Sequence, residues 1–438
     1  MIEKPIFAFY GDDFTGSTDA LEALAINHIP AVLFLRMPDV QQLREFANCR
    51  AVGIAGESRS RSPQWMSDHL PLIFQTLKDT GASICQYKVC STFDSSPETG
   101  NIGRALEIGK QVFGAEFVPV FSAAPHLKRY VLFANLFAAA GACVYRIDRH
   151  PTMSCHPVTP MRDGDLRAHL AWQTKSRVVS FDMPRFAAPD PESELRDLLS
   201  DHPDAVLFDG WDEQSLRMSA RMIWEHRAQA PFVVGSSGFT HGLAALLRTE
   251  PQSQRAIESN FPQHGVDRIV VVSGSCSPIT ERQIHWAMSN GFAGYRINVQ
   301  AIADPATADS ERKKLLEDAN RSLQSGSGVV LYSALGPTDC RQVRARNELG
   351  TQMGLMLREL LLRSGVQRVL IAGGDTSTHA GQQLGVYALT VQAPLTPGAP
   401  LCKAHSEDDR LHGLELVLKG GQVGLDDFFG AVLKGRME

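Results

Sequence analysis

Adjacent carboxylates and hydroxyls follow the first apolar run of this 438-residue chain. Asp12 and Asp13 open a segment that continues Phe-Thr-Gly-Ser-Thr-Asp, and they come directly after the run at residues 5–10. Carboxylates accept hydrogen bonds from sugar hydroxyls, and one of them could take a hydroxyl proton during a transfer reaction. The alternative is structural, because Asp13 or Thr15 could simply cap the helix that follows. We expect Asp12 and Asp13 to bind a hydroxylated substrate, with Asp13 as a candidate catalytic residue.

Two cations stand at later strand ends, among hydroxyl groups. Ser58 and Arg59 follow the apolar run at residues 51–55, and a guanidinium beside a hydroxyl suits bidentate capture of a carboxylate. Lys88 closes the next run and precedes Ser91, so these two residues suggest an anion cradle. The alternatives are that Arg59 is a solvated surface residue and that Lys88 has a buried stem with a hydrated tip. All four are candidate ligands of an acidic substrate.

The second half of the chain contains three turns of small residues after apolar runs. They occupy residues 273–277 (Ser-Gly-Ser-Cys-Ser), residues 373–377 (Gly-Gly-Asp-Thr-Ser) and residues 419–424 (Lys-Gly-Gly-Gln-Val-Gly). The first two each precede a predicted helix. A strand, a small turn and a helix start together present backbone N–H groups to phosphate. One glycine turn is common in any protein, but three in one half of a chain favour a phosphate-binding domain.

Several other motifs are missing from the sequence. There is no Gly-x-x-x-x-Gly-Lys-[Ser/Thr], so a P-loop enzyme is excluded. No Gly-x-Gly-x-x-Gly follows a predicted strand and no Gly-x-Ser-x-Gly occurs, which disfavours a dinucleotide oxidoreductase and a serine hydrolase. The net charge of -5 gives no electrostatic reason to expect nucleic acid or an anionic membrane as the partner.

Short apolar runs alternate with helix-like stretches in both halves and place these residues at strand ends. Such alternation is typical of parallel sheets flanked by helices, where ligands bind at the carboxyl ends of strands. The polar, proline-containing residues 249–266 interrupt the pattern and are interpreted as a linker. We predict an α/β protein of two domains, at residues 1–248 and 266–438. Each is a mostly parallel sheet flanked by helices, with the active site in the cleft between them.

The individual elements follow from the same runs. Strands are predicted at residues 5–10, 31–35, 51–55, 83–88, 117–121, 177–181, 205–208, 232–235, 268–272, 328–332, 368–372 and 414–419. Helices are predicted at residues 17–27, 65–80, 102–113, 280–290, 344–364, 376–385 and 426–434. The apolar residues 130–145 are too few for a membrane span and are predicted to be a buried helix and strand. The eight cysteines lack metal-finger spacing, so we expect small buried residues of a reduced compartment and a cytoplasmic protein.

At these motifs the chain resembles the four-carbon acid sugar kinase family, whose members are similar over nearly their whole length. The matching pieces, in chain order, are residues 12–16, 57–59, 87–88, 91–94, 100–103, 156–161, 273–277 and 373–377. The resemblance implies a soluble enzyme with an N-terminal substrate domain and a C-terminal ATP domain. It implies phosphorylation of the terminal (C4) hydroxyl of 3-oxo-tetronate, threonate or erythronate, and it leaves a homodimer open.

The resemblance also implies which residues contact the nucleotide. They are Ser273, Ser275, Ser277, Gly373, Gly374, Asp375, Thr376, Ser377, Gly420 and Gly421. The last turn departs from the Lys-Ser-Gly-Asn-Phe-Gly run usual in the family, because a hydroxyl and an asparagine are replaced. Phe93 and Asp94 are closer to the oxo-tetronate branch of the family. Residues 146–151, before the His156 loop, are a candidate marker of a sub-branch with its own substrate.

Phosphoryl transfer needs mainly positioning and charge neutralisation, which these residues could supply. We predict that Arg59 and Lys88 hold the carboxylate of the acid, while the amides at residues 373–376 hold phosphates together with Mg²⁺. Asp375 is a candidate magnesium ligand or base and joins Asp13 as a candidate catalytic residue. Two alternatives stay open. One is a non-catalytic sensor of sugar acids that keeps both pockets, and the other is a nucleotide-dependent dehydrogenase of sugar acids.

Overall fold

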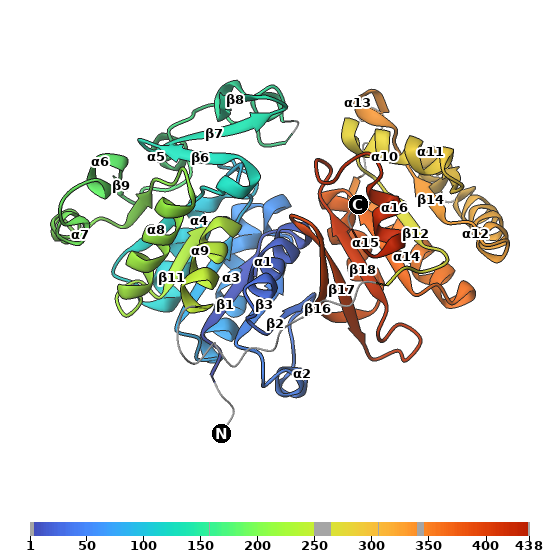
Figure 1. Ribbon diagram of the computed structural model, residues 1–438, viewed down its shortest axis with the longest axis horizontal. Coiled ribbons are helices and arrows are strands. Elements are labelled where there is room, and N and C mark those ends of the chain that lie inside the picture. The colour runs from blue at the N-terminus through green and yellow to red at the C-terminus, as the bar shows by residue number, and fades with distance from the viewer. Residues whose placement is uncertain (1–3, 157, 249–263, 305, 340–345, 437–438) are drawn as a thin grey trace. The chain divides into compact units, whose positions relative to one another are not determined.

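The computed structural model describes residues 4–156, 158–248, 264–304, 306–339 and 346–436. Contacts within the chain divide it into two compact units (Figure 1). The first unit comprises Met1–Asp12, Ala23–Ala31 and Val40–Ile257, and the second comprises Asp13–Glu22, Val32–Asp39 and Glu258–Glu438. Two short segments of the N-terminal half thus group with the second unit. The predicted domain boundaries stay a prediction, because most of the predicted linker, residues 249–263, lies outside the described residues.

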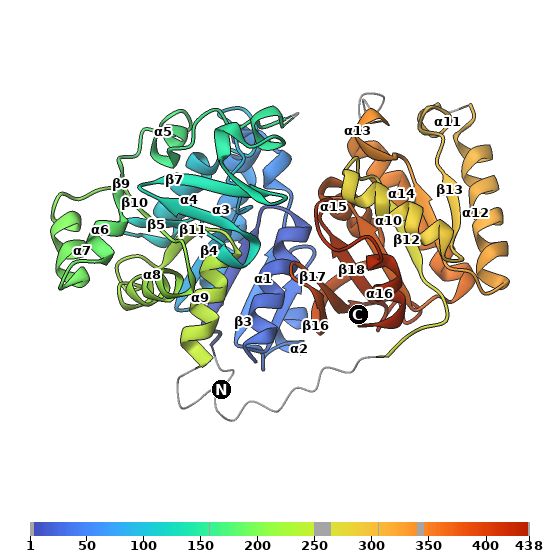
Figure 2. The same ribbon diagram turned by 45° about the horizontal axis from the view of Figure 1, so that its top comes forward.

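A parallel sheet forms the centre of the first unit. Its strand order is β3-β1-β4-β11-β5-β10-β9, and its neighbouring strands all pair in parallel. Helices flank this sheet on both faces (Figure 2). Its strands therefore bury both of their faces, which is why the sequence shows continuous apolar runs rather than alternation. The strands are β1 (Phe7–Gly11), β3 (Ala51–Ala55), β4 (Ile84–Lys88), β5 (Val118–Phe121), β9 (Val178–Phe181), β10 (Ala205–Phe208) and β11 (Phe232–Gly235).

Local signals begin and end the helices of the first unit. Ser62 caps the third helix by accepting a hydrogen bond from the Trp65 N–H, and Asn101 caps the fourth, which ends at Gly114 with a φ of 70°. Helix α3 (Pro63–Asp79) packs beside α4 (Ile102–Phe113), and α8 (Glu213–Glu225) packs beside α9 (Ser237–Arg248). The α-helices of the N-terminal half are α1 (Phe14–Ile26), most of which belongs to the second unit, α2 (Val40–Glu45), α3 (Pro63–Asp79), α4 (Ile102–Phe113), α5 (Leu166–Ala171), α6 (Met183–Phe186), α7 (Pro191–Ser200), α8 (Glu213–Glu225) and α9 (Ser237–Arg248). The 3₁₀ turns are η1 (Ser58–Ser60), η2 (Pro125–Leu127), η3 (Ile147–Arg149) and η4 (Met153–Cys155).

A small antiparallel sheet shows that the prediction for residues 130–145 was wrong. It consists of β6 (Arg129–Leu132), β7 (Asn135–Ala140) and β8 (Cys143–Arg146). Phe133 and Ala134 form its first turn with φ of 52° and 64°, and both of their N–H groups donate to the Asp209 carboxylate. A short apolar run by itself is compatible with either a helix or strands. A carboxylate distant in sequence instead stabilises a hairpin, so the predicted helix does not form.

The second unit has a mixed sheet in the order β13-β14-β12-β15-β18-β17-β16-β2. The first five strands are parallel, whereas the last four pair antiparallel to one another. Phe34 is opposite Ala388 where β2 pairs with β16. The strands are β2 (Ala31–Phe34), β12 (Val270–Ser273), β13 (Ala293–Arg296), β14 (Val329–Tyr332), β15 (Arg368–Ala372), β16 (Val386–Thr396), β17 (Ala399–Ser406) and β18 (Glu415–Lys419).

The long hairpin of β16 and β17 was missed by the sequence analysis. Proline inside an apolar run argues against a strand, because it cannot donate to the ladder. Pro394 and Pro400 nevertheless lie within these strands, near a shift in pairing register between Ala393 and Thr396. A register shift leaves backbone groups outside the ladder, so proline is tolerated there.

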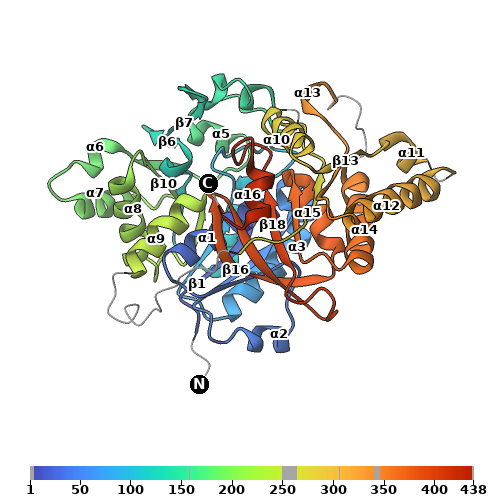
Figure 3. The same ribbon diagram turned by 45° about the vertical axis from the view of Figure 1, so that its right-hand side comes forward.

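Helices also flank the sheet of the second unit, and α14 packs along α15 (Figure 3). The approach is close because Gly354 faces the backbone of α15. A Cβ at Gly354 would lie 2.6 Å from the Cα of Ala380. The helices are α10 (Pro278–Ser289), α11 (Val299–Ala303), α12 (Ala308–Gln324), α13 (Gly336–Asp339), α14 (Arg346–Ser364), α15 (Gly374–Gln383) and α16 (Phe428–Lys434).

The predicted α/β class with mostly parallel sheets is confirmed, and each predicted strand is present with ends within two residues. The cysteine prediction holds only in part. Cys85 and Cys402 are buried, but Cys143 and Cys155 are exposed. In the described part of the chain, no helix is long and apolar enough to cross a membrane.

Candidate active site

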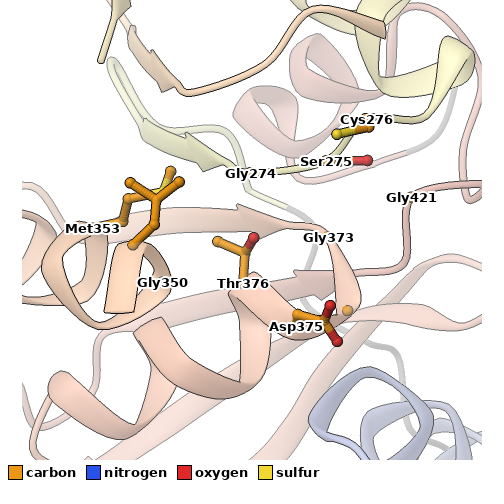
Figure 4. Close-up of a pocket in the computed structure, with 11 residues that line it drawn as sticks. Gly274, Ser275, Cys276, Gly350, Met353, Gly373, Asp375, Thr376 and Gly421 are labelled. Carbon is orange, nitrogen blue, oxygen red and sulfur yellow. The ribbon is translucent and has the colours of Figure 1, made fainter. Parts of the chain in front are cut away.

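A pocket with a volume of about 180 Å³ lies within the second unit, where β12 and β15 end (Figure 4). One side is formed by the turns that follow these strands, and the other by α14. The residues that line it are Gly274, Ser275, Cys276, Leu349, Gly350, Met353, Gly373, Gly374, Asp375, Thr376 and Gly421. All three small-residue turns predicted to bind phosphate therefore contribute to one pocket.

The turn between β15 and α15 brings backbone close to this pocket. Gly373 has a φ of 114°, a conformation that glycine adopts without strain. Its carbonyl accepts the first helical hydrogen bond of α15 from the Ser377 N–H, at 2.7 Å. The N–H groups of the three residues between them have no partner within the helix, and they carry the positive end of the helix dipole. Such a helix start binds anions.

The neighbouring turn after β12 lies against this helix start. A Cβ at Gly274 would lie 2.3 Å from the Thr376 hydroxyl oxygen, so a side chain there would displace Thr376. Ser275 Oγ accepts a hydrogen bond from the Ser277 N–H at 3.2 Å, and Ser277 caps α10 by accepting from Ile279. Ser275 therefore lies on the pocket wall, while Ser277 supports the turn.

The other predicted nucleotide residues lie around the pocket rather than on its wall. Ser273 is fully buried at the end of β12. Ser377 is also buried, and its hydroxyl donates to the Ile371 carbonyl at 3.2 Å. Gly420 precedes Gly421, which alone of the pair lines the pocket. The contacts predicted for these residues stay a prediction.

Asp13 has the structural role that the sequence analysis gave as the alternative, and its predicted contact with substrate stays a prediction. Its Oδ1 accepts from the Gly16 N–H at 2.6 Å, as a cap of α1 does, and its Oδ2 accepts from the Thr15 hydroxyl at 2.9 Å. The same Oδ2 is 3.6 Å from the position of a Cβ on Gly374, the first residue of α15. A second carboxylate, Asp375, is exposed and lines the pocket. Two carboxylates, those of Asp13 and Asp375, therefore lie near the start of α15 within the second unit.

The predicted substrate residues of the first unit meet where β1, β3 and β4 end. The Asp12 N–H donates to the Lys88 carbonyl at 3.0 Å, and the Arg59 N–H donates to the Asp12 carbonyl at 3.1 Å. The parallel register places Gly11 beside both Ala55 and Lys88. The sheet thus brings Asp12, Arg59 and Lys88 together from three separate stretches of the sequence.

Arg59 forms an ion pair with a carboxylate of the protein. Its Nη2 donates to Asp94 Oδ2 at 2.8 Å, and Asp94 also accepts from the hydroxyls of Thr92 at 2.5 Å and Thr159 at 3.3 Å. Burial alone would raise the pKa of Asp94. The positive charges of Arg59 and His156, together with these hydrogen bonds, outweigh burial and hold the pKa well below its usual range. Asp94 is therefore an anion, and it orients Arg59.

Three of the predicted substrate residues, Ser58, Ser91 and Lys88, are buried. Ser58 is fully buried, and its Oγ lies 2.9 Å from the Tyr87 hydroxyl, so it stabilises the interior of the unit. Ser91 is 7% exposed, and its carbonyl accepts from the Ser122 hydroxyl at 3.4 Å. Lys88 is 2% exposed at the end of β4, so the alternative of a hydrated tip does not describe it. Substrate contacts by these three residues stay a prediction.

Sequence reasoning missed the wall formed by α14. Leu349, Gly350 and Met353 line the pocket on its apolar side. One signal was available, because Gly350 and Gly354 are spaced four residues apart in a predicted helix, a spacing that lets another helix approach closely. It also missed Asp94, which appeared in a matching motif but was not assigned to the site.

The comparisons with known proteins agree with this arrangement. A model described as a sugar-binding N-terminal domain matches residues 7–243, and one described as a nucleotide-binding C-terminal domain matches residues 270–429. The chain is 43% identical to a 3-oxo-isoapionate kinase of Paraburkholderia graminis, over 99% of this chain and 95% of the relative. It is 28% identical to a 3-oxo-tetronate kinase of Cupriavidus necator, over 99% of this chain and 98% of the relative.

A solved structure from Salmonella typhimurium, described as a tRNA synthase, resembles the chain with a TM-score of 0.78 and 24% identity over 98% of both chains. At this identity the likeness shows the fold alone. Together, the two matched domains and the full-length similarity to a kinase show that the chain belongs to the four-carbon acid sugar kinase family. It is therefore an enzyme, an ATP-dependent phosphotransferase for a sugar acid.

Proposed function

We propose that this enzyme transfers the γ-phosphate of ATP to a hydroxyl of a short 3-oxo sugar acid. The observation that carries the proposal is the pocket at the start of α15, where unpaired helix N–H groups and the turn after β12 surround a space of about 180 Å³. An amide-lined pocket of this kind suits a phosphate chain. It lies in the unit that matches the nucleotide-binding domain.

In the proposed mechanism the chain's own residues act by positioning. The N–H groups of Gly374, Asp375 and Thr376 hold phosphate oxygens. Arg59 and Lys88 hold the carboxylate of the acid, while Asp12 orients one of its hydroxyls. Asp13 accepts the proton of the attacking hydroxyl, because its Oδ2 lies beside Gly374, where the phosphates are proposed to bind.

Kinases of this class generally use Mg²⁺, and the residues present fit such an ion. Magnesium is usually bound by one or two carboxylates together with substrate phosphates. Asp375 offers an exposed carboxylate on the pocket wall, and Asp13 offers a second near the same helix start. Bound there, the ion would neutralise the charge that develops on the phosphates.

The relatives favour 3-oxo-isoapionate as the substrate over 3-oxo-tetronate. The 3-oxo-isoapionate kinase is 43% identical to this chain, whereas the 3-oxo-tetronate kinase of Cupriavidus necator is 28% identical over a similar length. This ranking replaces the expectation from Phe93 and Asp94, which favoured the oxo-tetronate branch of the family. Both names share a 3-oxo acid, so the same Arg59 and Lys88 pair would serve either substrate. Transfer to a terminal hydroxyl stays part of the proposal.

The test is an ADP-release assay with both acids, threonate and erythronate. We expect Mg²⁺-dependent turnover, with the highest kcat/KM on 3-oxo-isoapionate. Nucleotide binding without turnover on any acid would instead support the non-catalytic sensor. A change in nicotinamide absorbance with these acids would support the dehydrogenase. Preference for 3-oxo-tetronate would contradict the substrate assignment and leave the kinase proposal intact.

A further inference from the structure

Lys419, the last residue of β18, carries a buried cation that the site described above does not use. Its side chain is 0% exposed. Its Nζ donates to Thr280 Oγ1 at 3.0 Å, to the Gly420 carbonyl at 2.9 Å and to the Gly421 carbonyl at 3.4 Å. Burial lowers the pKa of Lys419 to about 7, but three oxygen acceptors match the three donors of an ammonium group. Lysine is almost never fully buried without such partners.

These contacts determine how the two glycine peptides are oriented. The described residues contain no cis peptide bond, and in a trans peptide the C=O and N–H groups point in opposite directions. The Gly420 and Gly421 carbonyls point to Lys419, and Thr280 Oγ1 also donates to Gly421 at 3.0 Å. The N–H groups of Gly421 and Gln422 therefore point away from Lys419. Neither N–H donates a hydrogen bond to another group in the described part of the chain.

The same turn forms part of the pocket wall. Gly421 lines the pocket, and a Cβ on it would lie 2.9 Å from Ser275 Oγ. The far end of the turn is held from α10, where the Gln283 amide donates to the carbonyls of Val423 at 3.0 Å and Leu425 at 2.8 Å. Side chains thus hold the carbonyls of Gly420, Gly421 and Val423, and the Val423 N–H also donates to the Gly420 carbonyl at 3.2 Å. The N–H groups of Gly421 and Gln422 are left for a ligand.

We propose that Lys419 is a positioning residue of the nucleotide site: by holding the Gly420 and Gly421 carbonyls, it turns the N–H groups of Gly421 and Gln422 towards a nucleotide phosphate. The proposal rests on the proposed function. It also explains why this turn can dispense with the serine and asparagine usual in the family. Backbone amides bind phosphate whatever side chains the turn carries.

The experiment measures ADP binding by calorimetry in the full chain and in Lys419→Met, which keeps the length of the side chain but not its donors. We expect the Kd for ADP to rise about 10- to 100-fold, as for the loss of one or two charge-assisted hydrogen bonds. In steady-state assays the KM for ATP should rise while the KM for the acid stays unchanged. Thr280→Val keeps Lys419 and removes one of its hydrogen-bond partners, so it should raise the Kd for ADP by a smaller factor. This variant is the test if Lys419→Met does not fold.

Arg368→Lys is the matched control. Arg368 is an equally buried cation of the same unit, but its guanidinium donates to Glu415 and to the carbonyls of His264 and Val432, away from the pocket. The control should lower the melting temperature without changing the Kd for ADP. Unchanged ADP binding in a folded Lys419→Met, or in Thr280→Val if Lys419→Met does not fold, would overturn the role of Lys419 and leave the proposed function standing. A wild-type chain that binds no ADP would overturn both.

Discussion

At the scale of single residues, the predicted carboxylate-binding residue Arg59 of the first unit is paired with a carboxylate of the protein. Arg59 donates to Asp94, and Asp94 is itself held by two hydroxyls, so the guanidinium has a defined orientation before any substrate arrives. Orientation in advance reduces the entropy lost on binding. An arginine paired in this way can still bind a carboxylate, because its planar group presents five donors.

Arg59→Ala is therefore expected to act on the acid and not on the nucleotide. It removes the proposed carboxylate contact and leaves Asp94 buried without its main cation. The kcat/KM for the acid should fall by about 2–5 kcal/mol of transition-state stabilisation. The KM for ATP should change little. Arg61→Ala is a matched control, because Arg61 pairs with Glu57 at 2.7 Å near the surface. A loss confined to the KM for ATP would contradict the assignment of Arg59.

A second residue-scale prediction concerns Glu22, which is 5% exposed and accepts a hydrogen bond from the Gly398 N–H at 2.7 Å. Burial raises its pKa from 4.5 to about 8. The folded form therefore holds a proton that the unfolded chain releases, and stability falls as pH rises between these two values, by about 1.4 kcal/mol per pH unit.

Glu22→Gln keeps an oxygen acceptor for Gly398 but cannot ionise. The difference between the melting temperatures of Glu22→Gln and the wild type should therefore increase in favour of the variant between about pH 5 and pH 8. Above that range the difference should be constant. Melting curves of both proteins at several pH values measure this difference directly, because other titrating groups contribute equally to each. A difference that does not vary with pH would show that Glu22 is ionised throughout.

At the scale of elements, the start of α15 is the part of the fold on which the proposed nucleotide binding depends. The positive φ of Gly373 and the absence of a side chain at Gly374 let the first N–H groups of the helix reach the pocket. This arrangement needs the β15 strand before the turn and the packing of α14 along the helix.

Gly374→Val tests this element. The new side chain would begin 3.6 Å from Asp13 Oδ2 and extend into space proposed for phosphate, so ADP binding should become unmeasurable by calorimetry. Gly326→Ala is the control. Gly326 has a φ of 90° in open surroundings, so its substitution should cost about 1–2 kcal/mol of stability and leave ADP binding unchanged. Wild-type affinity in Gly374→Val would remove this turn from the nucleotide site.

At the scale of the whole molecule, the second unit is not a continuous piece of the sequence. It includes Asp13–Glu22 and Val32–Asp39, which supply a cap beside Gly374 and a strand that pairs with β16. Strand pairing of this kind protects an edge that would otherwise associate with another chain. The homodimer was only left open by the sequence and stays open, and the predicted cytoplasmic location stays a prediction.

A fragment of residues 264–438 should therefore be a poor substitute for the second unit. Without β2 the backbone of β16 is exposed, and without Glu22 the Gly398 N–H loses its acceptor. We expect the fragment to self-associate in sedimentation experiments and to melt at a lower temperature than the full chain. A monomeric fragment with the melting temperature of the full chain would show that the two N-terminal segments contribute nothing to this unit.

The sequence by itself determined the α/β class, most strands and the three turns that line the pocket, because strand, small turn and helix start are local patterns. Only the tertiary structure decided what each polar side chain contacts. Burial pairs Ser58 with Tyr87 and Arg59 with Asp94, and it places Lys419 beneath the glycine turn. The tertiary structure also determined the β16–β17 hairpin and the sheet at residues 129–146. Their stabilising partners are distant in sequence, so no local pattern could reveal them.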